Sequence, residues 1–335
     1  MKIRAALRSV PGKCAVLLIL FLLLAASVLL SLKLGSLKLS IAQIIGILWD
    51  RPAGIQYQIL CNIRLPRIRA GALVGAGLAV SGAILQGVMR NPLAAPGIIG
   101  VSSGGGLAGI LVLLALPQFS VLLVPAAFAG ALVTALLVYL LAWKQGVSPV
   151  RLILAGVAVA AMLGAVSSAI LLFHAEKAGG VLDFTIGSLT ARSWKHLHFS
   201  AWYLLAGLGA AFLFSEKLNV LALGDEIAKG LGLHVERVRF LFIALAALLA
   251  ASAVSIAGLL GFVGLIAPHI VRIAVGSDNR FLLPGSALFG AGMVTMCDTA
   301  GRLVIEPSEL PAGIIMALLG PPFFLWLLRG CRYEA

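Results

Sequence analysis

Few residues are spaced so that they could bind nucleotide, ligate a metal or act as a catalytic pair. The loop that cradles ATP phosphates has the pattern G-x-x-x-x-G-K-[ST]. The glycine-rich stretch Ser102–Gly106 has no lysine after it, and Gly12-Lys13 has no glycine-rich loop before it, so neither matches. The five histidines are scattered mostly at the ends of apolar runs: His174, His196, His198, His234 and His269. Without ligand spacing, interfacial or helix-capping histidines are favoured over metal ligands. We therefore predict no catalytic, cofactor-binding or metal-ligating residue, and we assign any ATP hydrolysis to a partner protein.

Other reactive side chains are equally sparse. The cysteines Cys14, Cys61, Cys297 and Cys331 have no C-x-x-C spacing, so they indicate small apolar residues and not a zinc site. Asp298 is the only acid near the interior of an apolar run, whereas an intramembrane enzyme needs paired catalytic groups. No T-V-G-Y-G-like loop or ring of acids indicates a channel filter. An ion channel or an intramembrane enzyme is thus a remote alternative.

The composition assigns the chain to the membrane. Hydrophobic residues make up 61% of the 335 residues, charged residues only 11%, and the mean hydropathy is +1.11. A soluble domain carries roughly 25% charged residues. The net charge of +13 would suit nucleic acid, but the lysines and arginines stand at the ends of apolar runs with little aromatic interleaving. The sequence therefore predicts an all-α polytopic protein that contacts lipid and no nucleic acid.

Charge-free runs locate the membrane spans, since a bilayer core of about 30 Å needs about 20 helical residues. The runs cover residues 14–32, 70–89, 91–143, 152–175, 196–215, 240–271, 281–297 and 310–328. The third would extend about 80 Å and the sixth about 48 Å as single helices, so each must be broken. We place the breaks at Pro117 to Pro125 and at Gly258 to Gly264. About ten spans result, and residues 39–49 form a short interfacial helix.

The small residues and the loop charges add two expectations. Gly71-x-x-x-Gly75, Gly100-x-x-x-Gly104 and Ala79–Gly82 predict faces on which helix backbones approach closely. Ten spans place both termini on one side, and the majority of the 25 lysines and arginines then favours the cytoplasm. The basic cluster Arg64, Arg67 and Arg69 would lie on the outer side. The chain is predicted to be a single transmembrane unit over residues 1–335.

The polar interruption at residues 216–239 is the longest loop predicted on the cytoplasmic side. Within it, residues 222–233 predict a short amphipathic helix with Asp225 and Glu226 in the first turn, where the helix dipole favours acids. A glycine at 230 or 232 would end it. Sequence physics leaves open whether the segment is a solvated loop or a docking element for another protein.

A resemblance favours docking. The chain resembles the FecCD permeases of type II ABC importers, which serve iron-siderophores, haem and cobalamin. The motifs that carry the resemblance run along nearly the whole chain: Arg64-Leu65-Pro66-Arg67, Val80-Ser81-Gly82, Gln86, Arg90-Asn91-Pro92-Leu93-Ala94, Pro96-Gly97, Leu223-Gly224-Asp225-Glu226 with Ala228 and Leu231-Gly232, Gly261 to Arg272, Glu309-Leu310-Pro311-Ala312-Gly313 and Gly320-Pro321-Pro322-Phe323-Phe324.

The resemblance implies the partners and the task. In this family two permeases form the channel, two ABC ATPase subunits bind on the cytoplasmic side and a soluble extracytoplasmic protein delivers the chelate. A homodimeric, multi-pass permease in the plasma membrane (inner membrane) of a bacterium is therefore expected, with no cofactor of its own and ATP used by the partner. Iron(III)-siderophore is the expected cargo because it is the commonest in the family, and haem and cobalamin are the alternatives.

The resemblance also implies roles for particular residues. Arg64 and Arg67, with Arg302 after the ninth span, match arginines that dock the binding protein, although an interfacial anchor is the alternative role for each. The segment that couples to the ATPase matches Leu223, Gly224, Asp225, Glu226, Ala228, Leu231 and Gly232 within 216–239. The cytoplasmic gate matches Gly146, Val147, Ser148 and Pro149, just before the fifth span. The pathway is expected along the fifth, eighth and tenth spans.

Overall fold

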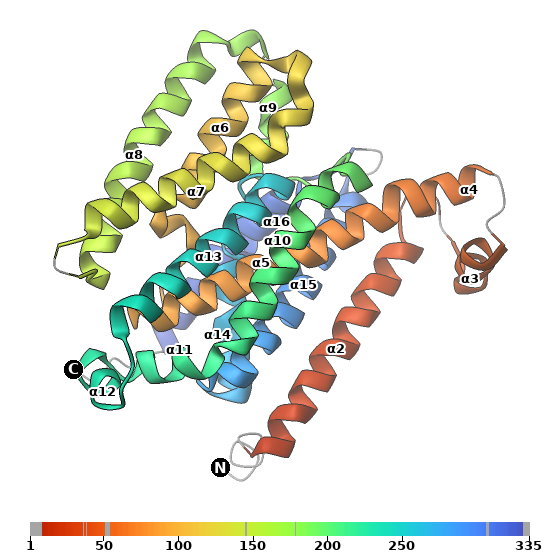
Figure 1. Cartoon of the computed structure of the whole chain (residues 1–335). Coiled ribbons are helices and arrows are strands. Elements are labelled where there is room, and N and C mark those ends of the chain that lie inside the picture. Colours follow the sequence, from red (N-terminus) through yellow and green to blue (C-terminus); the bar gives the residue numbers. More distant parts are fainter. Residues whose placement is uncertain are drawn as a thin grey trace.

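The fold is known from a computed structural model that describes residues 9–35, 37, 39–50, 54–144, 146–177, 179–305 and 308–330, with side chains to residue 325. Over these residues the chain is helical, and its one β-type contact is an isolated bridge between Trp143 and Val147 (Figure 1). The elements in order are α2 (Val10–Lys33), α3 (Ile41–Asp50), α4 (Ile55–Tyr57), η1 (Gln58–Arg64), α5 (Leu65–Met89), η2 (Pro96–Ile99), α6 (Val101–Ala115), η3 (Pro117–Leu122), α7 (Leu123–Ala142), α8 (Pro149–Phe173), η4 (Ala175–Lys177), α9 (Gly179–Ile186), α10 (Trp194–Leu213), α11 (Ser215–Ala222), α12 (Asp225–Gly230), α13 (Val235–Ala257), α14 (Val263–Val275), α15 (Asn279–Val304) and α16 (Ala312–Gly330).

The predicted spans correspond to helices of the structure. Among the described residues, 7 helices are long and apolar enough to cross a membrane: α2, α5 with the residues from Ile55, α7 with η3, α8, α10, α13 and α15. The shorter apolar helices α6, α14 and α16 complete the set of about ten that the sequence predicted. Helix α3 is also apolar, but its 10 residues extend only about 15 Å, as expected of an interfacial helix.

Both predicted breaks are confirmed. Residues Pro117–Leu122 form a 3-10 segment between α6 and α7, since proline cannot continue the preceding ladder of hydrogen bonds. The second break lies between α13, which ends at Ala257, and α14, which begins at Val263. Gly258 there has a φ of +74°, and a Cβ on it would lie 2.1 Å from the carbonyl oxygen of Phe184. Only glycine fits that backbone contact.

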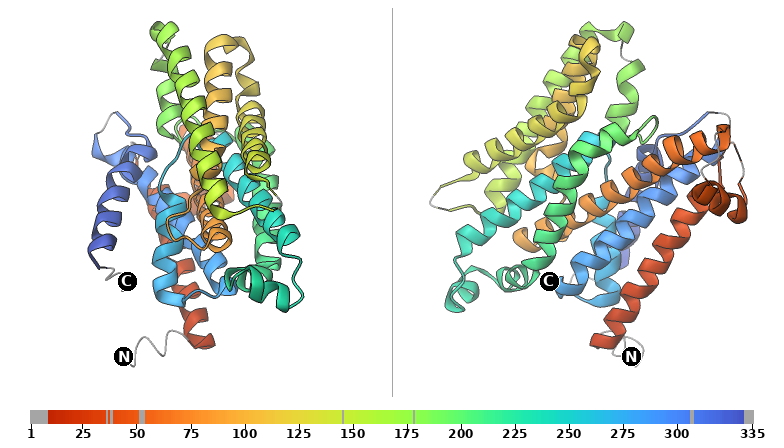
Figure 2. Two further views of the ribbon diagram at one scale, coloured as in Figure 1. Left: turned by 90° about the vertical axis from the view of Figure 1, so that its left-hand side faces the viewer. Right: turned by 45° about the vertical axis from the view of Figure 1, so that its right-hand side comes forward.

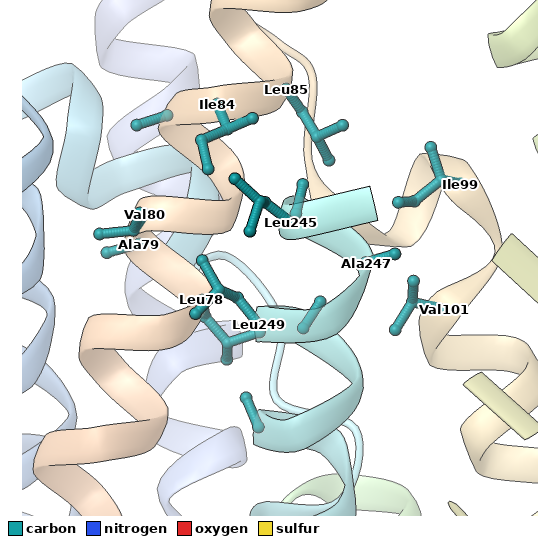
Figure 3. Close-up of a cluster of buried hydrophobic side chains, with 14 of the residues drawn as sticks. Leu78, Ala79, Val80, Ile84, Leu85, Ile99, Val101, Leu245, Ala247 and Leu249 are labelled. Atoms are coloured by element: carbon teal, nitrogen blue, oxygen red, sulfur yellow. The ribbon is translucent and has the colours of Figure 1, made fainter. Parts of the chain in front are cut away.

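Helix α5 is the centre of the bundle (Figure 1), with 20 of its 25 residues buried. Its apolar side chains pack against α13, where Leu78 and Ile84 lie close to Leu245 and Leu249 (Figure 3). The predicted glycine contact is present on another face, because a Cβ on Gly75 would lie 2.2 Å from the carbonyl oxygen of Gly290 on α15. Backbones that touch in this way stabilise helix pairs where lipid supplies no hydrophobic drive.

Two other predicted small-residue faces also pack backbone against backbone. A Cβ on Gly82 of α5 would lie 1.9 Å from the carbonyl oxygen of Gly264 on α14. One on Gly104 of α6 would lie 2.5 Å from that of Gly130 on α7. These contacts fix α5, α14, α6 and α7 at distances that no larger side chain allows.

Helices α2 and α8 lie at the edges of the bundle, and the two ends of the molecule differ. Helix α2 packs on α15, while α8 stands beside α6 and α7 (Figure 1). The start of α2, the end of α16 and α12 share one end, whereas α3 and α9 lie toward the other (Figure 2). That arrangement agrees with the even number of crossings predicted from the sequence.

Candidate functional site

The predicted coupling segment lies between α11 and α13 and is divided in a way that the sequence analysis missed. A single helix over 222–233 was predicted, but Gly224, with a φ of +114°, separates α11 from α12. Helix α12 contains only Asp225–Gly230, with both acids in its first turn as predicted. Gly232 has a φ of +80°, which explains the predicted glycine stop. The segment 216–239 is therefore mostly helical, not a loop.

The two acids of α12 have different surroundings. Asp225 turns toward the protein, where Arg239 Nη2 donates to both of its carboxylate oxygens at 2.7 Å. Arg90 Nη2, at the end of α5, lies 3.6 Å from Asp225 Oδ1. Glu226 is exposed. Asp225 thus holds α12 in place, and Glu226 is available to a partner.

An apolar stripe also faces outward from this segment. Leu223, Ile227 and Leu231 are all exposed: Ile227 lies on α12, Leu223 just before the break at Gly224 and Leu231 at the end of the helix. Ala228 is fully buried, so of the predicted coupling residues it supports the segment from within. Ile227 was not predicted as a site residue, although the four-residue spacing was visible in the sequence. An amphipathic helix of this kind suits a groove on another protein.

The predicted gate residues connect α7 to α8 at the same end of the molecule. Gly146 has a φ of +117°, and Val147 is buried. Ser148 caps α8, since its hydroxyl accepts from the backbone N–H of Arg151 at 3.3 Å, and Pro149 is the first residue of the helix. The backbone N–H of Val147 donates to Glu236 Oε2 on α13 at 3.3 Å. The loop is therefore tied both to α8 and to α13.

Near this end, Asp278 joins three helices. It caps α15 by accepting from the backbone N–H of Arg280 at 3.1 Å, and Asn219 of α11 donates to its Oδ1 at 2.9 Å. Lys13 of α2 lies 3.7 Å away. Hydrogen bonds from the Arg280 side chain, and then from Asn219, lower the pKa of Asp278 to about 2.

The three arginines predicted to dock a binding protein lie at the opposite end, where the structure buries them. Arg67 is 6% exposed and pairs with Asp298 in two directions, from Nε to Oδ2 at 2.8 Å and from Nη2 to Oδ1 at 2.9 Å. Its third nitrogen, Nη1, donates to Glu309 Oε2 at 2.7 Å. The guanidinium therefore joins α5, α15 and the segment before α16.

Arg64 and Arg302 are bound in the same way. Arg64 is 4% exposed and donates to the carbonyl oxygens of Leu32, at 2.6 Å, and Leu37. Arg302 is 8% exposed, donates to Ser31 Oγ at 2.7 Å and lies 3.6 Å from Asp298. Backbone carbonyls and acids from distant helices therefore enclose all three guanidinium groups, which the sequence analysis did not foresee. Whether they also influence a binding protein stays a prediction.

Sequence reasoning noted Asp298 near Arg302 but assigned no role to Glu309. No spacing rule joins residues that are 231 and 242 positions from Arg67, so their pairing was not visible. Over the part of the chain that the structure describes, no three His, Cys, Asp or Glu side chains gather as a metal site would require.

The described residues thus have exposed apolar side chains around α12 at one end and a buried charge cluster at the other. Comparison with known proteins shows the family to which the chain belongs. Residues 22–330 match the FecCD transport family. The chain belongs to that family. The Fe(3+)-citrate import system permease protein YfmE of Bacillus subtilis is 40% identical over 316 residues, which cover 94% of both chains. The cobalamin import system permease protein BtuC of Halobacterium salinarum is 45% identical over 279 residues, covering 83% of this chain and 75% of the relative.

A solved structure has the same fold as this FecCD permease. It is described as an inward-facing conformation of a metal-chelate type ABC transporter, and it matches with a TM-score of 0.84 at 34% identity, over 95% of this chain and 99% of that one. The family therefore assigns the chain to the transmembrane subunits of ABC importers, as a multi-pass membrane protein. In this FecCD permease the Arg90-Asn91-Pro92 motif ends α5: Arg90 has a φ of +50°, and Asn91 Oδ1 accepts from the N–H of Leu93 at 2.9 Å.

Proposed function

We propose that this chain is the permease that forms the translocation pathway for an iron(III)-siderophore complex. An extracytoplasmic binding protein delivers the complex, and partner ATPases drive its import. Family membership supports the importer role, and a relative named for Fe(3+)-citrate supports an iron chelate as cargo. The whole of residues 1–335 serves as one transmembrane domain.

The observation that carries this proposal is the open surface of α8. Of its 25 residues, only Leu152, Gly156 and Val159 are buried in a single chain. The helix carries no acid, its only base is Arg151 at the cytoplasmic end, and alanine, glycine and serine recur along it. A wall of this kind lets a bulky chelate pass without binding it tightly, because it offers few groups that could hold the chelate.

A second copy of the chain completes that pathway. We assign part of the open face of α8 to the pathway, whose opposite wall is the matching surface of a second permease, and the remaining outer part to lipid. The residues at 146–149, which precede α8, then form the cytoplasmic gate between the two copies. Passage requires alternation between states that differ in how they expose this face.

The cytoplasmic stripe of Leu223, Ile227 and Leu231 docks the ATPase, with Glu226 at its edge. Gly224 and Gly232 shape the turns of that segment, and Asp225 and Ala228 hold it against the protein. At the outer end, Arg64, Arg67 and Arg302 support docking of the binding protein by fixing the shape of the rim, since their own charges are enclosed.

Reconstitution of the permease with its cognate ATPase and binding protein in liposomes tests the function. ATP-dependent accumulation of radioactive iron from a binding protein loaded with an iron(III)-hydroxamate complex is the expected result. Stimulation of ATP hydrolysis by haem or by cobalamin, and by no siderophore, overturns the cargo while keeping the importer. Failure of any ATPase to assemble with the permease overturns the importer role itself.

A further inference from the structure

A chain of charges joins α12 to the loop before α8, and it passes through one buried arginine. Arg239, in the first turns of α13, is 2% exposed. Its Nη2 donates to both oxygens of Asp225, and its Nη1 donates to Glu236 Oε1, all at 2.7 Å. The other oxygen of Glu236 accepts from the backbone N–H of Val147 at 3.3 Å. Hydrogen bonds therefore connect α12 continuously to the gate loop, residues 146–149.

The gate loop is built to move with α8. Arg151, on the first turn of α8, donates from Nη1 to the carbonyl oxygen of Lys144 and from Nη2 to that of Gly146, both at 3.0 Å. Ser148 caps the same turn. The loop and the first turn of α8 are thus bonded to each other. A shift of the backbone at Val147 is therefore expected to move the start of α8 as well.

The carboxylate of Glu236, which accepts from Val147, is also closely packed against Gly146. A Cβ placed on Gly146 would lie 3.1 Å from Glu236 Oε1, so the carboxylate packs directly against the loop backbone. Gly146 has a φ of +117°, a conformation that other residues rarely adopt. The loop backbone therefore follows the position of the Glu236 carboxylate closely.

We infer that Arg239 is the positioning residue that transmits movement of the ATPase-bound helix α12 to the cytoplasmic gate, through Asp225 on one side and Glu236 on the other. A buried guanidinium without a carboxylate is strongly disfavoured, so Arg239 follows Asp225 when α12 shifts. Glu236 follows Arg239, and the loop at 146–149 follows Glu236. The Nε–H of Arg239 has no acceptor among the described residues, which leaves it a donor for a second arrangement of the same carboxylates.

This inference rests on the proposed function, because it needs an ATPase at α12. The experiment therefore reads the gate directly and needs no knowledge of the cargo. The probe is a single cysteine made by Val150→Cys, at an exposed position on the first turn of α8, in a chain whose four native cysteines are replaced by alanine. The complex with the ATPase is held in nanodiscs, and the rate of maleimide labelling is measured without nucleotide and after trapping with ATP and vanadate.

Arg239→Met is the test variant, and Arg237→Met is its matched control, because Arg237 is exposed on the same turn of α13. We expect trapping to change the labelling rate severalfold with native Arg239 and with Arg237→Met. Because Arg239→Met also removes a contact that holds α12, its labelling is compared only where the ATPase still co-purifies and hydrolyses ATP. In that complex we expect the nucleotide-dependent change in labelling rate to be at least fivefold smaller than with native Arg239. A change of full size in Arg239→Met overturns the inference.

Glu236→Ala decides the question if Arg239→Met fails to assemble. It keeps the pair between Asp225 and Arg239, and hence the docking helix, but removes the contact with Val147. Loss of the nucleotide-dependent labelling supports the relay, and retention of it overturns the relay. If the ATPase binds none of the chains, including the one with native Arg239, the proposed function fails and not the relay.

Discussion

Replacement of Arg67 by methionine is the perturbation that most sharply separates a buried anchor from a docking charge. Arg67 and Asp298 are 6% and 3% exposed, so removal of the guanidinium leaves a carboxylate inside the protein. Arg302, 3.6 Å away, is the charge that would remain beside it. Loss of one partner from a buried pair costs about 3–5 kcal/mol. Because Arg302 offsets part of this, we expect about 3 kcal/mol, or roughly a hundredfold in the unfolding equilibrium.

Unfolding of the purified permease by SDS in mixed detergent micelles, followed by circular dichroism, measures this loss. The double variant Arg67→Met with Asp298→Leu removes both charges, and we expect it to be more stable than Arg67→Met alone by at least about 1 kcal/mol, since contacting residues are not additive. Glu309, which is 37% exposed at its side chain, stays hydrated in both variants. The matched control is Arg69→Met, an exposed arginine two residues away that stacks on Trp194 at 4.8 Å. Its loss is expected to stay within about 1 kcal/mol.

A loss below about 1 kcal/mol for Arg67→Met would refute the reasoning, because a guanidinium that costs so little to remove must already be hydrated. Normal stability combined with loss of stimulation by the binding protein would restore the docking role in its original form. The anchored arrangement instead predicts that stability and stimulation fall together, and that the second substitution at Asp298 recovers part of the stability.

Three further outcomes follow from the structure. Ile227→Asp should lower the amount of co-purified ATPase at least tenfold without unfolding the permease, because the side chain is exposed on α12; pull-down with tagged ATPase measures it. Gly82→Ala should destabilise by about 1–3 kcal/mol in the same SDS titration, because its Cβ meets the backbone of α14 at 1.9 Å, whereas Gly209→Ala, with open space around it, should be neutral or slightly stabilising. The lowered pKa of Asp278, about 2, contributes about 1 kcal/mol after solvent screening, present above about pH 4 and lost toward pH 2. The stability difference between the native chain and Asp278→Asn should therefore shrink over that pH interval.

The membrane architecture was predictable because its causes are local. Spans follow from runs without charge, and the breaks at Pro117 and Gly258 follow from the backbone chemistry of single residues. Close contacts at Gly75 and Gly82 also follow, since small residues repeat on one helical face. Each of these features depends on residues that lie close together in the sequence.

The charge partners were not predictable because they depend on positions far apart in the chain. Arg67 and Asp298 are 231 residues apart, and their pairing requires α5 and α15 to pack in one particular register. Burial of Arg64 and Arg302 depends likewise on the end of α2. The division of the coupling segment at Gly224 was different, since a glycine before two acids is itself a helix-start signal that the amphipathic pattern obscured.

Acidic residues are scarce in this chain, which makes the few acids that pair with arginines informative. The chain has 25 lysines and arginines and 12 acidic residues, so acids are too few to pair with every base. Arg67, near the start of α5, pairs with buried Asp298, and Arg90, just after its end, lies 3.6 Å from the partly exposed Asp225. Between these two arginines, the backbone of α5 contacts α15 at Gly75 and α14 at Gly82. Contacts from distant parts of the chain therefore hold α5 at its outer end, through Arg67 and Asp298, and along its middle, through Gly75 and Gly82.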